Sequence, residues 1–202
     1  MTQTDQQAST VLDLGLEPSQ AMTVATLGPP GTSSEASARY LLDWASRHLD
    51  SPDGAVQLHT TYEHAAEAVL TDAATHLLVA NAYGQISRFY MDPKLSIGAA
   101  YRFNTPDYGL AKARGTQVPA RIDVATHPSP IPLIEELLPD GMEVSAVVPM
   151  LSTSAAAASV AAGQMTVALT TDVAAKIYDL EFISPVRPIE MLWTAFTRTR
   201  SA

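Results

Sequence analysis

The sequence predicts an α/β protein of two lobes with a ligand site in the cleft between them. From Thr23 onward, short apolar runs typical of strands alternate with helical patterns, which indicates parallel-rich sheets covered by helices. Two extended stretches punctuated by Pro, residues 97–109 and 182–188, interrupt this alternation. We interpret them as the places where the chain crosses to a second lobe and returns. Ligand sites commonly lie in the cleft that such an arrangement creates.

Residues 22–101 and 186–202 are therefore expected to form lobe 1, and residues 102–185 lobe 2. Residues 1–21 are polar and aperiodic, which predicts a flexible tail with one short element over residues 11–16. The sequence shows no clear internal repeat.

The expected strands are apolar runs rich in Val, Leu, Ala and Thr. They are residues 23–27, 56–60, 76–80, 122–126, 144–148 and 166–170, with residues 191–198 as a last strand that rejoins lobe 1. The expected helices are residues 33–49, 62–70, 131–138, 155–162 and 172–178. Two helix starts carry the capping-box pattern, a hydroxyl followed three residues later by Glu, in residues 32–35 and 60–63.

Composition excludes several classes of protein. Hydrophobic residues make up 47% of the chain and charged residues 16%, which is typical of a globular domain. The net charge of −9 argues against a nucleic-acid partner. The chain has no Cys, so disulfides and thiol catalysis are excluded, and it has no apolar run long enough for a membrane span. The N-terminus lacks the pattern of a signal peptide, so we expect a cytoplasmic protein.

Hydroxyl side chains follow four of the expected strands and precede helices. These junction residues are Thr32, Ser33 and Ser34; Ser129; Ser152, Thr153 and Ser154; and Thr170 and Thr171. The carboxyl ends of parallel strands face the ligand crevice, and a helix N-terminus there offers free N–H donors. Four such junctions predict a ligand with more than one anionic group. The alternative is that these residues are ordinary helix caps, since Ser and Thr are preferred there.

The first junction, TLGPPGTSSE in residues 26–35, differs from a plain cap. Gly28 and Gly31 allow the backbone to approach a ligand or to adopt a positive φ. The segment is neither a phosphate loop ending in Gly-Lys-Ser/Thr nor the spaced Gly triad of dinucleotide sites. ATP and NAD are therefore not expected as ligands.

No metal site is expected, because none of the five His forms a metal-ligand pair. His127 directly follows a strand, between Thr126 and Pro128, and so points toward the crevice if the two-lobe interpretation holds. It either contacts the substrate or hydrogen-bonds the loop. No Ser–His–Asp arrangement can be assigned from the sequence.

Aromatic and cationic side chains are expected beside the cleft in two further groups. These are Tyr83, Arg88 and Tyr90, and Arg102, Thr105 and Tyr108. An Arg near the crossing is a suitable partner for a carboxylate. The alternatives are that Arg88 belongs to an amphipathic surface turn and that Arg102 ties the lobes together.

Four motifs resemble, in the same order, the catalytic domain of prephenate dehydratases. They are LGPPGTSSE (27–35), HPSP (127–130), STSAAA (152–157) and LTTDVAAKIYDLEFI (169–183), and the similarity covers about residues 22–200. The resemblance implies a two-lobed α/β fold similar to type II periplasmic binding proteins, with the active site in the inter-lobe cleft.

The sequence departs from the dehydratase pattern in two segments. Ala80–Gly84 stands where dehydratases carry Pro-Ile-Glu-Asn-Ser, and Leu192–Phe196 replaces their Asn-x-Thr-Arg-Phe. The Thr of that motif corresponds to Thr194, and the Arg is lost. No ACT regulatory domain of the kind that bacterial dehydratases usually carry is expected, and neither is feedback by phenylalanine.

The segments AYGQISRFYM (82–91) and TPDYGLA (105–111) extend the resemblance to the prephenate decarboxylases of bacilysin and related secondary-metabolite pathways. This resemblance implies non-aromatising decarboxylation of prephenate to a dihydro-4-hydroxyphenylpyruvate, in antibiotic biosynthesis, by a homodimer. The alternatives are a dehydratase that gives phenylpyruvate and a non-catalytic small-molecule-binding module.

The absence of a cofactor motif fits this chemistry, because the ring diene of prephenate accepts the electrons that CO2 leaves behind. The side-chain carboxylate and keto group are assigned to the 32–34 and 152–154 junctions. The ring carboxylate is expected against a less polar wall. His127, Tyr83 and Tyr108 are the candidate proton donors, and Thr194 is the fourth candidate catalytic residue.

Overall fold

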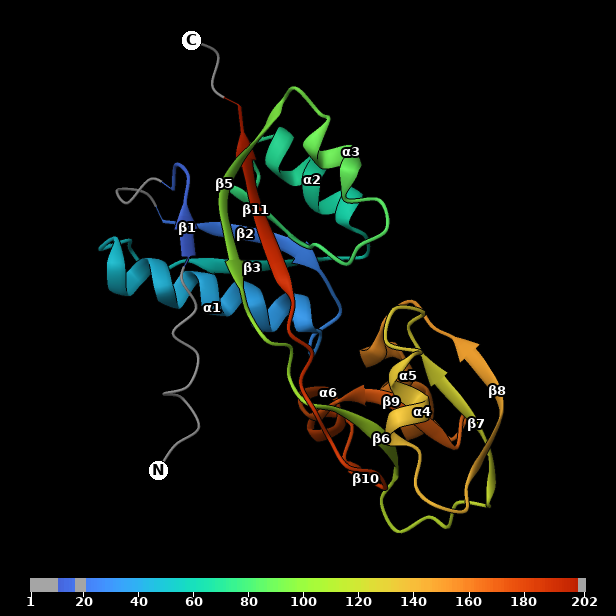
Figure 1. Ribbon diagram of the computed structural model, residues 1–202. Helices are drawn as coiled ribbons and strands as arrows, with labels where there is room; N and C mark the ends of the chain where they lie inside the picture. The colour runs from blue at the N-terminus through green and yellow to red at the C-terminus, as the bar shows by residue number, and fades with distance from the viewer. Residues whose placement is uncertain (1–10, 17–20, 200–202) are drawn as a thin grey trace. The chain divides into compact units, whose positions relative to one another are not determined.

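The computed structural model describes residues 11–16 and 21–199, and the chain divides into two compact units (Figure 1). Unit 1 contains the described residues up to Gly28, then Ser34–Asn104 and the chain from Glu190 onward; unit 2 contains Pro29–Ser33 and Thr105–Ile189. Most of the predicted tail, residues 1–21, lies outside the described residues. Its expected short element is present as strand β1, Val11–Asp13.

The loop Pro29–Ser33 was expected in lobe 1 but belongs to unit 2. Two buried hydroxyls of unit 2 account for this placement. Ser154 Oγ donates to the carbonyl of Pro30 at 2.7 Å, and Thr171 Oγ1 donates to the carbonyl of Gly31 at 3.0 Å. Because these carbonyls find their donors in unit 2, the chain enters this unit for five residues and then returns to unit 1.

Unit 1 is built on a six-stranded mixed sheet in the order β1-β5-β11-β4-β2-β3. Its further elements are β2 Thr23–Leu27, α1 Ser33–His48, β3 Ala55–His59, α2 Tyr62–Leu70, β4 His76–Ala80, α3 Ser87–Tyr90, β5 Leu95–Arg102 and β11 Leu192–Arg198. Strands β3, β2 and β4 are parallel, whereas β11 runs antiparallel to both of its neighbours. The expected return of residues 191–198 to the first sheet is thus confirmed.

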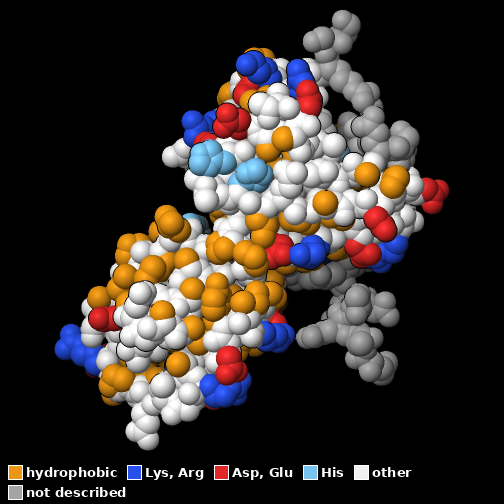
Figure 2. Space-filling model, turned by 180° about the vertical axis from the view of Figure 1, so that it is seen from behind, with side chains coloured by type: hydrophobic (Ala, Val, Ile, Leu, Met, Phe, Trp, Pro, Cys, Tyr) orange, Lys and Arg blue, Asp and Glu red, His pale blue; other side chains and the backbone are white. Residues whose placement is uncertain are grey.

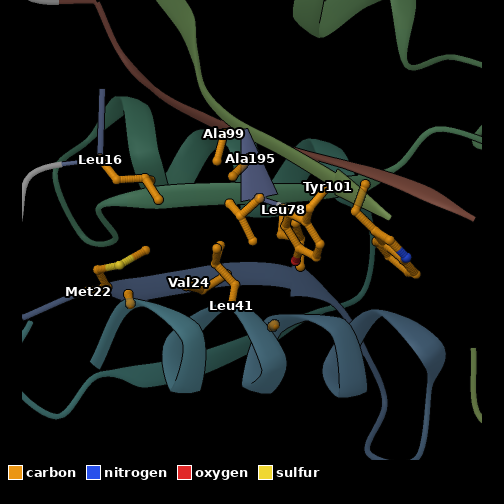
Figure 3. Close-up of a cluster of buried hydrophobic side chains, with 12 residues drawn as sticks. Leu16, Met22, Val24, Leu41, Leu78, Ala99, Tyr101 and Ala195 are labelled. Atoms are coloured by element: carbon orange, nitrogen blue, oxygen red, sulfur yellow. The ribbon is translucent and has the colours of Figure 1, made fainter. Parts of the chain in front are cut away.

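Helix α1 covers one face of this sheet, and α2 and α3 cover the other. Successive residues of the strands alternate between the faces, as the pleat of a strand requires. Val24 and Leu78 pack with Leu41 of α1, and Figure 3 shows these side chains between the helix and the strands. Val79 and Phe196 belong to the opposite cluster, with Ala65 of α2 and Phe89 of α3.

Unit 2 is built on a five-stranded mixed sheet in the order β10-β6-β9-β7-β8. Its elements are β6 Tyr108–Ala113, β7 Arg121–Thr126, α4 Leu133–Leu137, β8 Glu143–Pro149, α5 Thr153–Ala161, β9 Val167–Thr171, α6 Asp172–Ile177 and β10 Leu180–Phe182. Strands β8, β7 and β9 are parallel, and β6 runs antiparallel to β9. Helix α4 packs on one face, while α5 and α6 pack on the other mainly through alanines.

The two units share a structural repeat that the sequence does not reveal. In each unit, three parallel strands joined by helices are arranged with the first strand in the middle, as β3-β2-β4 and as β8-β7-β9. An antiparallel strand then pairs with the third strand, β11 in unit 1 and β6 in unit 2. The repeat is hidden because large side chains fill much of the core around α1, whereas alanines dominate the core around α5.

All seven predicted strands and all five predicted helices are present, with ends shifted by a few residues. The parallel-rich sheets expected from the alternation are instead mixed. The extended stretch 97–109 contains most of β5 and the start of β6, and α3 and β10 were not predicted as separate elements. The second capping box is offset by one residue, because Thr61 rather than Thr60 accepts from the backbone N–H of His64. Among the described helices, none is both long enough and apolar enough to span a bilayer.

Candidate active site

The glycines of the first junction are needed by the chain's own packing. A Cβ at Gly28 would lie 3.0 Å from Cβ of Leu58. Gly31 has a φ of +87°, and a Cβ there would lie 3.3 Å from Cα of Ala174. The expected positive φ is therefore present at Gly31, and the close neighbour is helix α6 of the same unit. These contacts explain both glycines without a ligand.

Four of the nine junction hydroxyls predicted to bind substrate contact the protein's own backbone in unit 2: Ser152, Ser154, Thr170 and Thr171. Ser152 caps α5 by accepting from the N–H of Ala155, and Thr171 caps α6 by accepting from that of Ala174. Thr170 donates to the carbonyl of Thr153, and both residues are buried. Together with the bonds from Ser154 and Thr171 to the loop Pro29–Ser33, these contacts fix the loop against α5 and α6. The structure therefore brings these junctions together within one unit.

Tyr108 lies at the centre of this hydroxyl group. It begins strand β6, its ring is buried, and its hydroxyl lies 3.0 Å from Oγ of Ser33. Burial raises the pKa of Tyr108, while hydrogen bonds with Ser33 and Thr153 act in the opposite direction. The phenol therefore keeps its proton at neutral pH. The neighbouring Thr32 is also buried in unit 2.

His127 lies in the loop after β7 and is partly buried. Its Nδ1 accepts from the backbone N–H of Ser129 at 3.2 Å, so the ring proton of the neutral form is on Nε2. Burial lowers the pKa of His127. At neutral pH the ring is thus uncharged and offers an N–H donor, which suits hydrogen bonding to a carboxylate or keto oxygen. The Ser129 side chain itself is exposed.

In unit 1, Ser34 and Tyr62 join the start of α1 to the start of α2. The two hydroxyls lie 2.8 Å apart, and both residues are buried. The Tyr62 hydroxyl also accepts from the N–H of Ala80 at 3.4 Å, at the end of β4. The Tyr62 ring centroid is 4.8 Å from that of Tyr83. Tyr62 thereby connects the first junction to the segment Ala80–Gly84.

Tyr83 is held by a carboxylate. Its hydroxyl donates to Oε1 of Glu63 at 2.8 Å, and Nη1 of Arg88 donates to the same oxygen at 2.7 Å. Burial alone would raise the pKa of Glu63, but the bonds from Tyr83 and Arg88 outweigh it and the pKa is lowered. Burial and Glu63 together raise the pKa of Tyr83. Transfer of the Tyr83 proton to a substrate would therefore require the hydrogen bond between Tyr83 and Glu63 to break.

Arg102 and Thr105, expected at the lobe crossing, also have partners in the protein. Nη1 of Arg102 lies 3.2 Å from Oε1 of Glu190, and both side chains are exposed. Such a surface pair contributes little to stability. Thr105 is buried, and its backbone N–H and its Oγ1 bind the carbonyl and the N–H of Ile189. On the face shown in Figure 2, Lys and Arg side chains are likewise interspersed with Asp and Glu.

The two segments that depart from the dehydratase pattern meet in unit 1. Strands β4 and β11 are antiparallel neighbours, with Trp193 opposite Ala80. Oγ1 of Thr194 donates to Oδ1 of Asn81 at 2.9 Å and lies 2.8 Å from the Tyr90 hydroxyl. Ala195, at the position of the lost Arg, is fully buried in the apolar cluster under α1. Because successive strand residues alternate between the faces of the sheet, Ala195 lies on the α1 side, whereas Thr194 lies on the other side with the neutral groups of Asn81 and Tyr90.

Three residues that the sequence did not single out take part in these groups: Tyr62, Glu63 and Asn81. Tyr62 and Glu63 lie in the predicted capping pattern. That pattern explains their residue types by local helix capping, so it gives no sign of their contacts with distant residues. Asn81 stands out only as a substitution in a motif. Among residues 11–16 and 21–199, no three His, Asp or Glu side chains gather in a way that could hold a metal ion.

The fold places the chain among α/β proteins that pair two such sheet-and-helix units. It is similar to a prephenate dehydratase from Arthrobacter aurescens solved in complex with L-Phe, with a TM-score of 0.66 and 18% identity over 89% of this chain and 61% of that chain. It is also similar to a periplasmic substrate-binding protein of an ABC transporter from Coxiella burnetii, with a TM-score of 0.53 and 13% identity over 88% and 84% of the two chains. At these identities the likeness concerns the fold alone.

Sequence comparison with curated proteins gives the family. The chain is 38% identical to a prephenate decarboxylase of Planktothrix agardhii over 88% of both chains. It is 35% identical to a prephenate decarboxylase of Bacillus subtilis over 88% of this chain and 87% of that one. No model of a protein family matches the chain. The chain belongs to the prephenate decarboxylase family, as the motifs in its sequence predict.

Proposed function

We propose that this chain decarboxylates prephenate without aromatisation, releasing CO2 and a dihydro-4-hydroxyphenylpyruvate. The observation that carries the proposal is its identity of 34–38%, over 88% of its length, to curated proteins named prephenate decarboxylase. This similarity covers most of the chain and most of each relative.

The reaction requires the protein only to bind prephenate and to supply one proton. The bond between the ring and its carboxylate breaks, the electron pair enters the ring diene, and a proton adds to a ring carbon. Because the substrate is its own electron sink, the reaction needs no cofactor to accept electrons. Dehydration would instead require an acid that protonates the ring hydroxyl. The neutral side chain of Asn81, in a segment altered from the dehydratase pattern, supports the first route, since an amide is not such an acid.

In unit 2 we assign substrate binding to His127 and the start of α5. The neutral imidazole offers Nε2–H to a carboxylate or keto oxygen, and free N–H groups at the helix start suit an anion. Among the candidate proton donors, Tyr83 is set aside because its hydroxyl proton is donated to Glu63. The proton is therefore assigned to Tyr108 or His127. Tyr108→Phe and His127→Asn decide between them, because loss of the donor lowers kcat whereas loss of a binding contact raises KM.

The test is incubation of the purified protein with prephenate, with CO2 release measured and the organic product identified by NMR. A non-aromatic keto acid formed in equal amount to CO2 is expected. Phenylpyruvate as the main product would show a dehydratase instead. Tight binding of prephenate without turnover would show a binding module. Retention of activity after dialysis against a chelator is expected from a cofactor-independent enzyme.

Three finer predictions accompany this function. The product is expected to enter the biosynthesis of an antibiotic or related secondary metabolite, in keeping with the family resemblance. Homodimeric assembly is to be checked by light scattering on the purified protein. A cytoplasmic location is to be checked by fractionation of the producing cells.

A further inference from the structure

Three neutral side chains of unit 1, Asn81, Tyr90 and Thr194, form a closed ring of hydrogen bonds. Thr194 Oγ1 donates to Asn81 Oδ1 at 2.9 Å, and the Thr194 and Tyr90 hydroxyls lie 2.8 Å apart. Asn81 Nδ2 approaches the Tyr90 oxygen at 3.5 Å, the longest of the three contacts. The residues come from the turn after β4, from α3 and from β11, so only the folded unit assembles them. We call them the polar triad.

The directions of these bonds are determined by the number of protons available. A threonine hydroxyl has one proton, and Thr194 gives it to Asn81. The bond between Thr194 and Tyr90 must therefore be donated by Tyr90. The Tyr90 oxygen is left with lone pairs only, and Asn81 is left with the N–H groups of its amide.

The triad is accessible on one side. Thr194 is buried, whereas Tyr90 is 39% exposed and Asn81 is exposed. The outer edge thus presents one N–H donor and one lone-pair acceptor, separated by the long 3.5 Å contact. A hydroxyl group, which accepts one hydrogen bond and donates another, can insert there and satisfy both. A carboxylate cannot, because it has no proton for the Tyr90 oxygen.

We infer that the polar triad binds the ring hydroxyl of the substrate and keeps it from leaving. This inference rests on the proposed function. The hydroxyl accepts from the Asn81 amide and donates to the Tyr90 oxygen. No proton reaches it, because an amide N–H is not an acid near neutral pH and the Tyr90 proton is committed to Thr194. The C–O bond survives, and decarboxylation ends at the non-aromatic product. Asn81 and Tyr90 are thus specificity-determining residues.

The decisive variant is Asn81→Asp, which replaces the amide by an acid of the same shape. Its carboxyl group can transfer a proton to the ring hydroxyl, so that water and CO2 both leave and phenylpyruvate forms, and solvent then reprotonates the carboxylate. Phenylpyruvate is expected to rise at least about tenfold above the wild-type level and to increase further as the pH is lowered. Asn104→Asp is the matched control. It introduces the same charge in unit 1 outside the triad and should leave the product unchanged.

The second variant is Tyr90→Phe, which removes the acceptor for the ring hydroxyl. It should raise KM about tenfold with little change in kcat, because one hydrogen bond to bound substrate is lost. Tyr178→Phe, a phenol removed from unit 2, should leave KM unchanged. Folding of each variant is checked by circular dichroism.

The outcomes separate this inference from the proposed function. If wild-type protein forms phenylpyruvate or no product, the proposed function fails. If wild-type protein gives the non-aromatic keto acid, but folded Asn81→Asp yields no phenylpyruvate, the product-selecting role of the triad is wrong. A wild-type KM in Tyr90→Phe would likewise contradict binding of the ring hydroxyl.

Discussion

Lowering the pH from about 7.5 to about 5 should destabilise unit 1 through His76, a buried histidine at the start of β4. His76 is 6% exposed; its Nδ1 lies 2.7 Å from Oγ1 of Thr75, and its buried Nε2 has no hydrogen-bond partner. Burial lowers the pKa of His76 from 6.5 to about 4. The folded state therefore holds the ring neutral at a pH where the unfolded chain takes up a proton.

The sign and size of the effect follow from this difference in pKa. Between pH 6.5 and about pH 4 the unfolded state binds more protons than the folded state, so stability falls as the pH falls. With each pKa unit equivalent to about 1.4 kcal/mol, the loss due to His76 at about pH 5 is about 2 kcal/mol. The loss is complete only below the folded-state pKa.

Urea unfolding followed by tryptophan fluorescence measures this loss, because both tryptophans, Trp44 and Trp193, lie in unit 1. His76→Leu should reduce the difference in unfolding free energy between the two pH values by about 2 kcal/mol. His64→Gln, a change at an exposed histidine, should leave that difference intact. An equal pH dependence in wild type and His76→Leu would refute the assignment.

Three further changes have definite expected outcomes. Gly31→Ala should cost about 1–3 kcal/mol, because the φ of +87° and the contact with Ala174 both oppose a Cβ; a Tm equal to that of wild type in thermal denaturation would contradict this. Thr171→Val should cost about 1–2 kcal/mol in urea unfolding, since it removes the α6 cap and leaves the Gly31 carbonyl without its hydroxyl donor. Tyr83→Phe should change kcat by less than about threefold, because Glu63 holds the phenol proton; a loss of about a hundredfold in steady-state kinetics would instead identify Tyr83 as the proton donor.

Much of the fold could be predicted because the local signals agree with the final structure. The run His76–Ala80 is apolar, and it is a buried central strand. Strand β5 was missed because its segment contains Gly98 and two alanines, which have low strand propensity. Its pairing with β11 explains the glycine, since a Cβ at Gly98 would lie 2.9 Å from Cγ2 of Thr197. That close approach is a tertiary requirement, and no local pattern encodes it.

The site was harder to predict than the fold because its residues meet through strand order. The sequence identified the altered segments around Asn81 and Thr194 but gave no sign that they touch. Their contact requires β11 to pair with β4, although Trp193 follows its partner Ala80 by 113 positions in the sequence. Conversely, three of the hydroxyls that suggested substrate binding, Ser152, Ser154 and Thr171, serve as helix caps or anchor the loop Pro29–Ser33. Ser152 caps α5, whereas Thr171 both caps α6 and donates to the Gly31 carbonyl.

The short excursion of Pro29–Ser33 into unit 2 has a consequence for how the protein can be divided. The hydrogen bond from Thr171 to Gly31 spans 140 residues of sequence, so the end of β9 pairs with a loop that is synthesised much earlier. A fragment covering only Thr105–Ile189 would expose its Ser154 and Thr171 hydroxyls without their acceptors. Because a loop of the unit 1 sequence belongs to unit 2, we expect that neither unit can be excised or exchanged as one continuous fragment.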